Sequence, residues 1–190
     1  SKITLESFYK SYNNYPFSIL DSISLANLGG DFGVVGNEDI SSISKGNSYG
    51  VELLAQQKMS SSIYGILSAT YYRSRFEDKN DQLISSSWDN RFILNMTAGK
   101  KFKNNIELGF KYRYSGGSPY TPIDIINSSN RGIWDVNQRG VLDYDLLNTQ
   151  RLNGAHVLDV RIDKKWFFKS WSLNAYIDIE NILNSKSQLP

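Results

Sequence analysis

The segment 104–118, NNIELGFKYRYSGGS, constrains this chain most, because apolar and polar residues alternate along it without interruption. A period of two is typical of a β-strand, whose successive side chains point to opposite sides. One face holds Ile106, Leu108, Phe110, Tyr112 and Tyr114, and the other holds Glu107, Gly109, Lys111 and Arg113. In a soluble sheet the apolar face would pack against a core. In a membrane barrel it would face lipid, with aromatic residues at the water interface.

The same alternation recurs along the chain and predicts about eight strands of ~10–14 residues, longer than the typical 5–6. The other predicted strands are 2–12, 18–28, 48–59, 63–76, 88–102, one that starts at Val157, and 172–183. Asn13, Asn14 and Pro16 predict the end of the first strand, since proline lacks a ladder donor. The glycines at positions 29, 30, 33 and 36 predict turns.

The predicted connections alternate in length, and this favours a meander of antiparallel strands. Short connections fall at 60–62, 103–105 and 169–170, whereas 77–87 and 116–155 are long, polar or irregular. Tight turns on one side and long loops on the other are typical of outer-membrane barrels. No segment shows helical periodicity over a useful length. The sequence therefore predicts an all-β, antiparallel up-and-down transmembrane β-barrel, present in part.

Composition excludes several classes of protein. The 190 residues have a mean hydropathy of −0.41 and no run near the ~20 apolar residues of a membrane helix. That excludes a helical membrane protein but not a β-barrel, whose alternation hides the lipid face. A net charge of +2, with dispersed lysine and arginine, argues against nucleic-acid binding. The absence of cysteine removes disulfides and cysteine-based sites.

The charged faces of the predicted strands allow two interpretations. The alternating charges from Asp159 to Lys165 fit either a solvated face of a half-buried sheet or the lining of a water-filled lumen. Aromatic residues near strand ends favour the lumen; they are Tyr71, Tyr72, Tyr112, Tyr114, Trp166 and Trp171. We therefore expect these rings at the rims of an apolar band. The face away from lipid should hold Glu107, Lys111, Arg113, Asp159, Arg161 and Asp163.

Candidate chemistry is sparse, and we predict no catalytic residue, metal or cofactor. His156 is the only histidine, and its nominal triad partners Ser128, Ser129 and Asp159 belong to residue types that are abundant here. Three aspartates in the long loop, Asp135, Asp143 and Asp145, lack the regular spacing of a calcium loop. The glycine pairs 116–117 and 29–30 open no predicted helix and so do not match a phosphate-binding loop. The chain is therefore not expected to be an enzyme.

Four segments carry a resemblance to a known family. They are SYGVEL at 48–53, SGGSPYTP at 115–122, LDVRIDKK at 158–165 and YIDIENILN at 176–184. In this order and spacing, the chain resembles the C-terminal part of the barrel of a TonB-dependent outer-membrane receptor of the Bacteroidetes type. The resemblance implies one partial barrel domain over residues 1–190, without the plug, the TonB-contacting segment or the closing strands.

The resemblance also implies a function, which is energy-coupled uptake of a scarce ligand across the bacterial outer membrane. The ligand would be a metal chelate, cobalamin or a glycan. The expected partners are outer-membrane lipid, the rest of the barrel and plug, and TonB acting through the plug. Two alternatives remain: a self-contained eight-stranded outer-membrane barrel with a binding or structural role, and an outer-membrane hydrolase that would need a Ser/His pair. The segment 185–190 offers no terminal aromatic residue for a closing strand.

Overall fold

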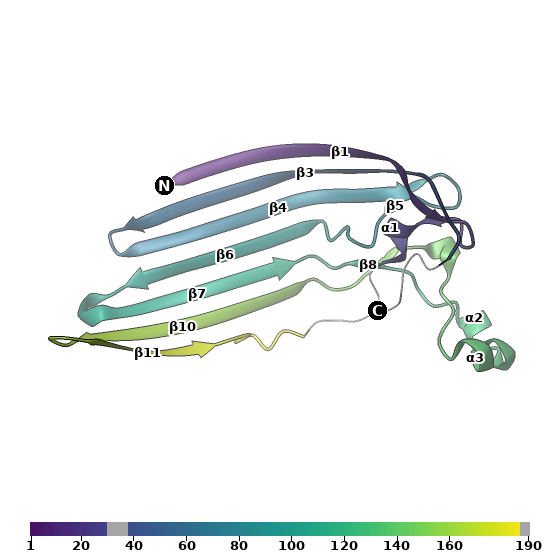
Figure 1. Ribbon diagram of the computed structural model, residues 1–190. Helices are drawn as coiled ribbons and strands as arrows, with labels where there is room; N and C mark the ends of the chain where they lie inside the picture. Colours follow the sequence, from purple (N-terminus) through teal and green to yellow (C-terminus); the bar gives the residue numbers. More distant parts are fainter. Residues whose placement is uncertain (30–37, 187–190) are drawn as a thin grey trace.

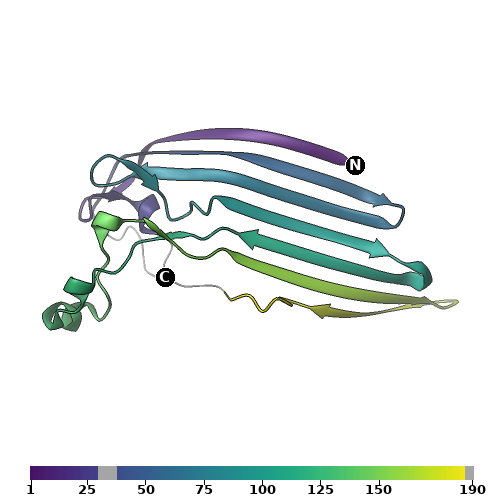
Figure 2. The same ribbon diagram turned by 180° about the vertical axis from the view of Figure 1, so that it is seen from behind.

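The chain forms one extended antiparallel sheet of long strands, seen from the two sides in Figures 1 and 2. The computed structural model describes residues 1–29 and 38–186. Seven strands make up the body of the sheet: β1 (Lys2–Ser18), β3 (Ile40–Ser60), β4 (Ile63–Glu77), β6 (Phe92–Lys101), β7 (Ile106–Ser115), β10 (Ala155–Phe167) and β11 (Ser172–Ile179). Their order in space, β11-β10-β7-β6-β4-β3-β1, is that of a meander, so the up-and-down prediction is confirmed.

The two ends of the sheet differ in how the strands are joined. At one end, the turn end, β3–β4, β6–β7 and β10–β11 are joined by tight turns, the second of which is the short helix η1 (Lys103–Asn105). At the other end, the loop end, the long connections fold into small elements gathered on one side of Figure 1. These are β2 (Ile23–Ser24), α1 (Leu25–Leu28), β5 (Leu83–Ser85), β8 (Pro119–Tyr120), α2 (Ile125–Ser128), α3 (Arg131–Asn137), η2 (Tyr144–Leu146) and β9 (Gln150–Arg151).

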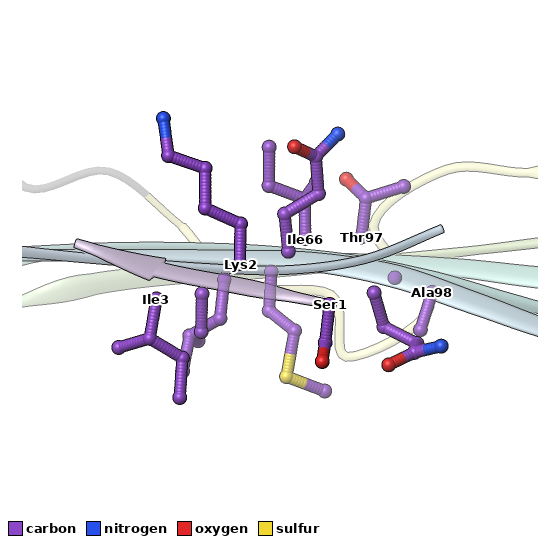
Figure 3. A pocket seen from close by; sticks show the side chains of 12 residues that line it. Ser1, Lys2, Ile3, Ile66, Thr97 and Ala98 are labelled. Atoms are coloured by element: carbon purple, nitrogen blue, oxygen red, sulfur yellow. The ribbon is translucent and has the colours of Figure 1, made fainter. Parts of the chain in front are cut away.

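The pairing register sorts the side chains by face, because residues paired across neighbouring strands lie on the same side of a sheet. One row runs Ile3, Ala55, Leu67, Met96, Tyr112 and Leu158 across six strands. The adjacent row runs Lys2, Gln56, Ile66, Thr97, Lys111 and Asp159. Figure 3 shows the start of these rows, with Lys2 and Thr97 projecting to one side and Ile3 to the other. The sheet thus has an apolar face and a polar face.

Among the described residues, no hydrophobic core lies under the sheet. The buried apolar residues of the described chain are Ile23, Ala26, Phe76 and Leu147, and all four lie at the loop end. By contrast, Ile3 and Leu5 on the apolar face are 75% and 70% exposed. At the loop end, the ring of Phe76 packs on Tyr12 and Tyr15, with ring centroids 5.2 and 4.7 Å away. The apolar face of the sheet therefore lacks any partner within the described chain.

Several sequence predictions are corrected by the structure. The predicted strand 18–28 is wrong, because this range holds a turn, the two-residue β2 and the helix α1. Pro16 does not end β1. The strand continues to Ser18, with shifts of the pairing register on both sides of Tyr15 and a left-handed backbone conformation at Asn14. The strand predicted over 88–102 starts only at Phe92. The predicted glycine turns at positions 30, 33 and 36 lie outside the described residues.

The sheet remains open. β11 forms one edge, β1 with the short β2 forms the other, and no closed barrel is found in the described chain. The all-β antiparallel prediction is confirmed at this level. The three hairpin turns are also displaced from one another along the strand direction. Ile63, which follows the first turn, pairs with Lys100, and Ile106, which follows the second turn, pairs with Lys164, several residues before the third turn. Such a stagger means that the strands tilt relative to the line through the turns.

Candidate functional site

The apolar face is the first candidate interaction surface. Its centre consists of aliphatic side chains from every long strand, including Leu53, Leu67, Leu94, Leu108, Val160 and Ile177. Leu108, Ile162 and Ile177 are 40%, 45% and 65% exposed. A continuous exposed apolar surface over seven strands is far more than a soluble monomer leaves to water, and it marks an interface.

Aromatic residues border this face at both ends. Toward the loop end a row crosses neighbouring strands, formed by Tyr9, Tyr49, Tyr71, Phe92 and Tyr114. Tyr9 is paired with Tyr49, Tyr71 is paired with Phe92, and the rings of Phe92 and Tyr114 lie 5.9 Å apart. Toward the turn end, Lys100 Nζ lies 5.2 Å from the Phe102 ring and Lys164 Nζ lies 5.6 Å from the Trp166 ring. Apolar side chains thus occupy the middle of the face and amphipathic ones its borders.

The polar face carries the predicted charged residues. The register places Lys111 opposite Asp159, Glu107 opposite Asp163, and Arg161 opposite Asp178. Arg113 lies two residues from Lys111 and so on the same face. The prediction that Glu107, Lys111, Arg113, Asp159, Arg161 and Asp163 share one face is therefore confirmed.

These charges form pairs rather than a site for one bound group. Arg113 Nη2 lies 3.0 Å from Asp159 Oδ2, and Arg161 Nε lies 2.8 Å from Asp163 Oδ2. The Arg161 guanidinium also stacks on the ring of Tyr176, with its Cζ 3.8 Å from the ring centroid. Beside these pairs lies an open cavity of about 290 Å³ whose polar lining includes Lys111, Asp159, Arg161 and Asp178. The face offers hydrogen-bonding partners for water or polar solutes.

A buried charge cluster holds the loop end together. Asp89 is fully buried, and its carboxylate accepts hydrogen bonds from Arg73 Nε (3.2 Å), Arg151 Nη2 (2.8 Å) and the backbone N–H of Ser74 (3.0 Å). Arg91 Nε lies 3.9 Å away. Burial lowers the pKa of the Arg151 guanidinium, and the nearby Arg91 lowers it further, whereas Asp89 opposes the shift. The carboxylate joins β4 to the loop that follows β5 and to β9.

Two asparagines extend this cluster into a network that joins distant loops. Asn148 Nδ2 donates to the backbone oxygens of Asn27 (2.9 Å) and Ser85 (3.0 Å). The side chain of Asn27 in turn donates to the backbone oxygen of Glu77 at 3.0 Å. Both asparagines are buried, so these bonds stabilise the arrangement where water cannot replace them. The network fixes α1, the hairpin of β4 and β5, and the segment before β9 as one unit.

The structure does not bring the nominal triad together. His156 pairs with Tyr114 on the apolar face, whereas Asp159 lies on the polar face and accepts from Arg113 and the backbone N–H of Asn181. Ser128 and Ser129 lie at the end of α2, where their hydroxyl groups bond to backbone atoms of Val141 and Ile126.

The three aspartates of the long loop do not form a common site, because each has a different partner. Asp135 pairs with Arg131, Asp143 caps η2, and Asp145 pairs with Lys79. Among residues 1–29 and 38–186, no group of three or more histidine or acidic side chains could hold a metal ion.

Sequence reasoning missed the residues of the loop-end network. Asp89 and Arg151 are 62 positions apart in the sequence, and Asn27 and Asn148 are 121 positions apart. No local sequence pattern therefore predicts either contact. The only local signal is that Asp89 lies in a polar stretch beside Trp88, and the strand predicted over 88–102 included both residues. A carboxylate that caps the end of a β ladder is recognisable only once the ladder is known.

In comparisons with known proteins, no family model, no curated protein and no solved structure matches this chain. The resemblance to TonB-dependent receptors therefore stays a hypothesis. Among the described helices, none has the length and apolar character required to cross a membrane.

Proposed function

We propose that this chain forms part of the wall of an outer-membrane receptor barrel that takes up a scarce ligand with energy supplied through TonB. The observation that carries the proposal is the separation of the two faces by the register of seven strands. The apolar face would contact lipid, the polar face would line the lumen, and the loop end would contribute to the external vestibule.

The dimensions of the apolar face support a bilayer environment. On β10, His156 lies beside the aromatic row at the loop end and Trp166 lies in the border at the turn end. Ten residue steps separate them, which is about 33 Å along a strand. A strand tilt of about 40° reduces this to about 25 Å of height, similar to the apolar band of outer-membrane barrels. The ammonium of Lys164 lies over the Trp166 ring and donates to the carbonyl oxygen of Asn104 in the β6–β7 turn, so it extends from within this span toward the turn end, as long cationic side chains do at membrane borders.

The open edges support a wall segment of a larger barrel. Within residues 1–29 and 38–186, β1 and β11 each have one edge without a paired strand along most of its length, and in hydrocarbon these backbone groups must be paired with other strands. Further strands of the same barrel would provide this pairing. Uptake, the plug and TonB come from the family resemblance, and the ligand class stays open among metal chelates, cobalamin and glycans.

Two neighbouring substitutions test the assignment of the faces. Leu67 belongs to the apolar face and Ser68 to the polar face at the centre of β4. In the protein that carries this chain, folded into phosphatidylcholine vesicles, Leu67→Arg should lower the free energy of unfolding by about 2–4 kcal/mol. Ser68→Arg should change it by less than about 1 kcal/mol, because the new charge would meet water. Equal losses, or a larger loss for Ser68→Arg, would sink the proposal.

The transport function is tested in cells that lack the gene. Growth would be compared with ferric siderophore, cyanocobalamin or a starch oligosaccharide as the limiting nutrient. We expect a defect on one of the three that a proton-gradient uncoupler reproduces in wild-type cells. Normal growth on all three would contradict energy-coupled uptake of these ligand classes.

The same open edges distinguish the proposal from a self-contained small barrel. A small barrel requires β1 and β11 of one molecule to pair, so cysteines introduced in both strands would crosslink within a single chain. A wall segment predicts no such crosslink, and it predicts that the isolated 190 residues associate in detergent-free buffer through their edges and apolar face. Sedimentation of a monodisperse, cooperatively unfolding monomer would favour a soluble β-domain instead.

A further inference from the structure

The segment 19–28 follows β1 and contains β2 and α1, and we call it the inner segment. β2 pairs with β1, and β1 and β3 separate it from β4 in the order of the sheet. β2 nevertheless contacts both β3 and β4, which requires that it lie over one face of the sheet. In α1, Asn27 Nδ2 donates to the backbone oxygens of Phe76 and Glu77 of β4, at 3.3 and 3.0 Å. The inner segment therefore crosses one face of β1, β3 and β4 at the loop end (Figure 1).

The face that the inner segment covers is the polar face. On β3, Ser44 and Gly46 belong to the polar face and are buried, whereas Lys45 between them points to the opposite side and is exposed. On β4, Ser74 and Phe76 also belong to the polar face and are only 7% and 5% exposed. Burial at the loop end thus follows the alternation of the strands, and it falls on the side that carries the charged residues elsewhere in the sheet.

The inner segment is held in this position by apolar contacts and by hydrogen bonds. Ile23 and Ala26 are 0% and 5% exposed, so their burial stabilises the packed position of the segment. The backbone oxygen of Asn27 accepts hydrogen bonds from Ser87 Oγ and Asn148 Nδ2, each at 2.9 Å. These two donors come from the segment after β5 and from the segment before β9. The inner segment is therefore fixed to the sheet and to both neighbouring loops.

We propose that the inner segment is a fixed constriction of the lumen at the loop end, and that it limits the size of the solutes that enter. The inference rests on the proposed membrane function, in which the polar face lines the lumen. A connection that extended outward from the rim would leave the cross-section of the lumen free. A connection that lies over the polar face of three strands occupies part of that cross-section, and the diameter of a pore decides which solutes pass.

The test measures how fast two thiol reagents, added outside intact cells, modify a reporter cysteine in the complete protein that carries this chain. The reporter is Thr70→Cys, on the polar face of β4 and nearer the turn end than the inner segment. The small reagent is sulfonatoethyl methanethiosulfonate, and the large one is a poly(ethylene glycol) maleimide. Ile23→Asp places a charge at a fully buried position and should release the inner segment. We then expect the large reagent to react at least about 10-fold faster, and the small one to change by less than about 2-fold.

The matched control is Ile126→Asp, the same substitution at an 83% exposed position of α2, also at the loop end. It should leave the rates of both reagents unchanged. A second variant replaces residues 19–28 by a glycine-serine linker of the same length, which removes the constriction without placing a charge in a buried site. This variant should also react faster with the large reagent, and it serves as the test if the Ile23→Asp protein does not reach the membrane.

The outcomes separate this inference from the proposed function. The constriction is overturned if the large reagent reacts at the same rate with the linker variant as with the original inner segment, whether that rate is high or undetectable. It is also overturned if Ile126→Asp accelerates the large reagent as much as Ile23→Asp does. Reaction of the small reagent with Leu67→Cys but not with Thr70→Cys would contradict the assignment of the faces, and therefore the proposed function itself. Reaction at Thr70→Cys without any dependence on reagent size would refute only this inference.

Discussion

The loop end and the turn end of the sheet achieve order in different ways. At the loop end, distant segments meet around the buried Asp89 and the two asparagines, with the small core of Phe76, Ile23 and Leu147 beside them. At the turn end, the strands are joined by tight hairpins, and the aromatic and lysine side chains remain exposed. The loop end is stabilised by its own contacts. The order of the turn end depends on the backbone pairing within its hairpins and on the medium around the sheet.

This difference shows where the chain can tolerate change. Charged groups removed from water are costly to leave unpaired, so the loop-end network behaves as one unit. Contacts between exposed cations and rings contribute little to stability, so the substitution of one such residue lowers the free energy of unfolding only slightly. Long loops need the first kind of order, because they have no ladder of their own to fix them.

The largest effect is expected from Asp89→Ala. This substitution leaves Arg73 and Arg151, which are mostly buried, without their shared carboxylate, and it frees the backbone N–H of Ser74. Breaking a buried ion pair costs about 3–5 kcal/mol. We expect loss of amide-exchange protection across 78–91 and 116–151, measured by hydrogen exchange with mass spectrometry, while the three hairpin turns keep theirs.

Two controls sharpen this result. Asp89→Asn retains an acceptor for Ser74 and should lose less protection than alanine. Asp145→Ala removes an exposed ion pair with Lys79 at the same end and should leave the amide-exchange protection of both ends nearly unchanged, because water screens such a pair. If Asp89→Ala changed the hairpins as much as the loops, the two ends would not be independent.

The sequence predicted the sheet well and the loop end poorly, for a physical reason. Alternation along residues 106–114 and 159–165 predicted both the strands and their faces, because a period of two is a local property. The prediction of a strand over 18–28 was wrong because the apolar side chains of Ile23 and Ala26 are buried in the small core at the loop end and do not form one face of a strand. The contacts of Asp89 with Arg151 depend on which loops meet, and no local pattern contains that information.

A smaller but still clear effect is expected from Gly117→Ala. A Cβ at this position would overlap the carbonyl oxygen of Leu152, which is backbone and cannot move aside by changing a rotamer. We expect a cost of about 1–3 kcal/mol, as for overpacking in a closed site. The matched control is Gly109→Ala in β7, where the nearest atom would be 3.9 Å away. Since alanine is no worse than glycine in a strand interior, the control should be neutral or slightly stabilising in a denaturant titration.

The smallest effect is expected at the turn end, from Trp171→Ala. The rings of Phe168 and Trp171 stack with centroids 4.1 Å apart and planes 16° from parallel, beside a backbone bond from Phe168 N–H to the Trp171 oxygen. Losing such a ring pair costs about 0.5–1.5 kcal/mol. That cost should appear as faster amide exchange at Phe168 alone, with the Asp89 network unchanged. Trp166→Ala is the control, because the structure describes no ring partner for Trp166, only the ammonium of Lys164. Faster exchange around Asn148 in either variant would mean that order at the turn end reaches the loop end through the strands, and the contrast between the two ends would then fail.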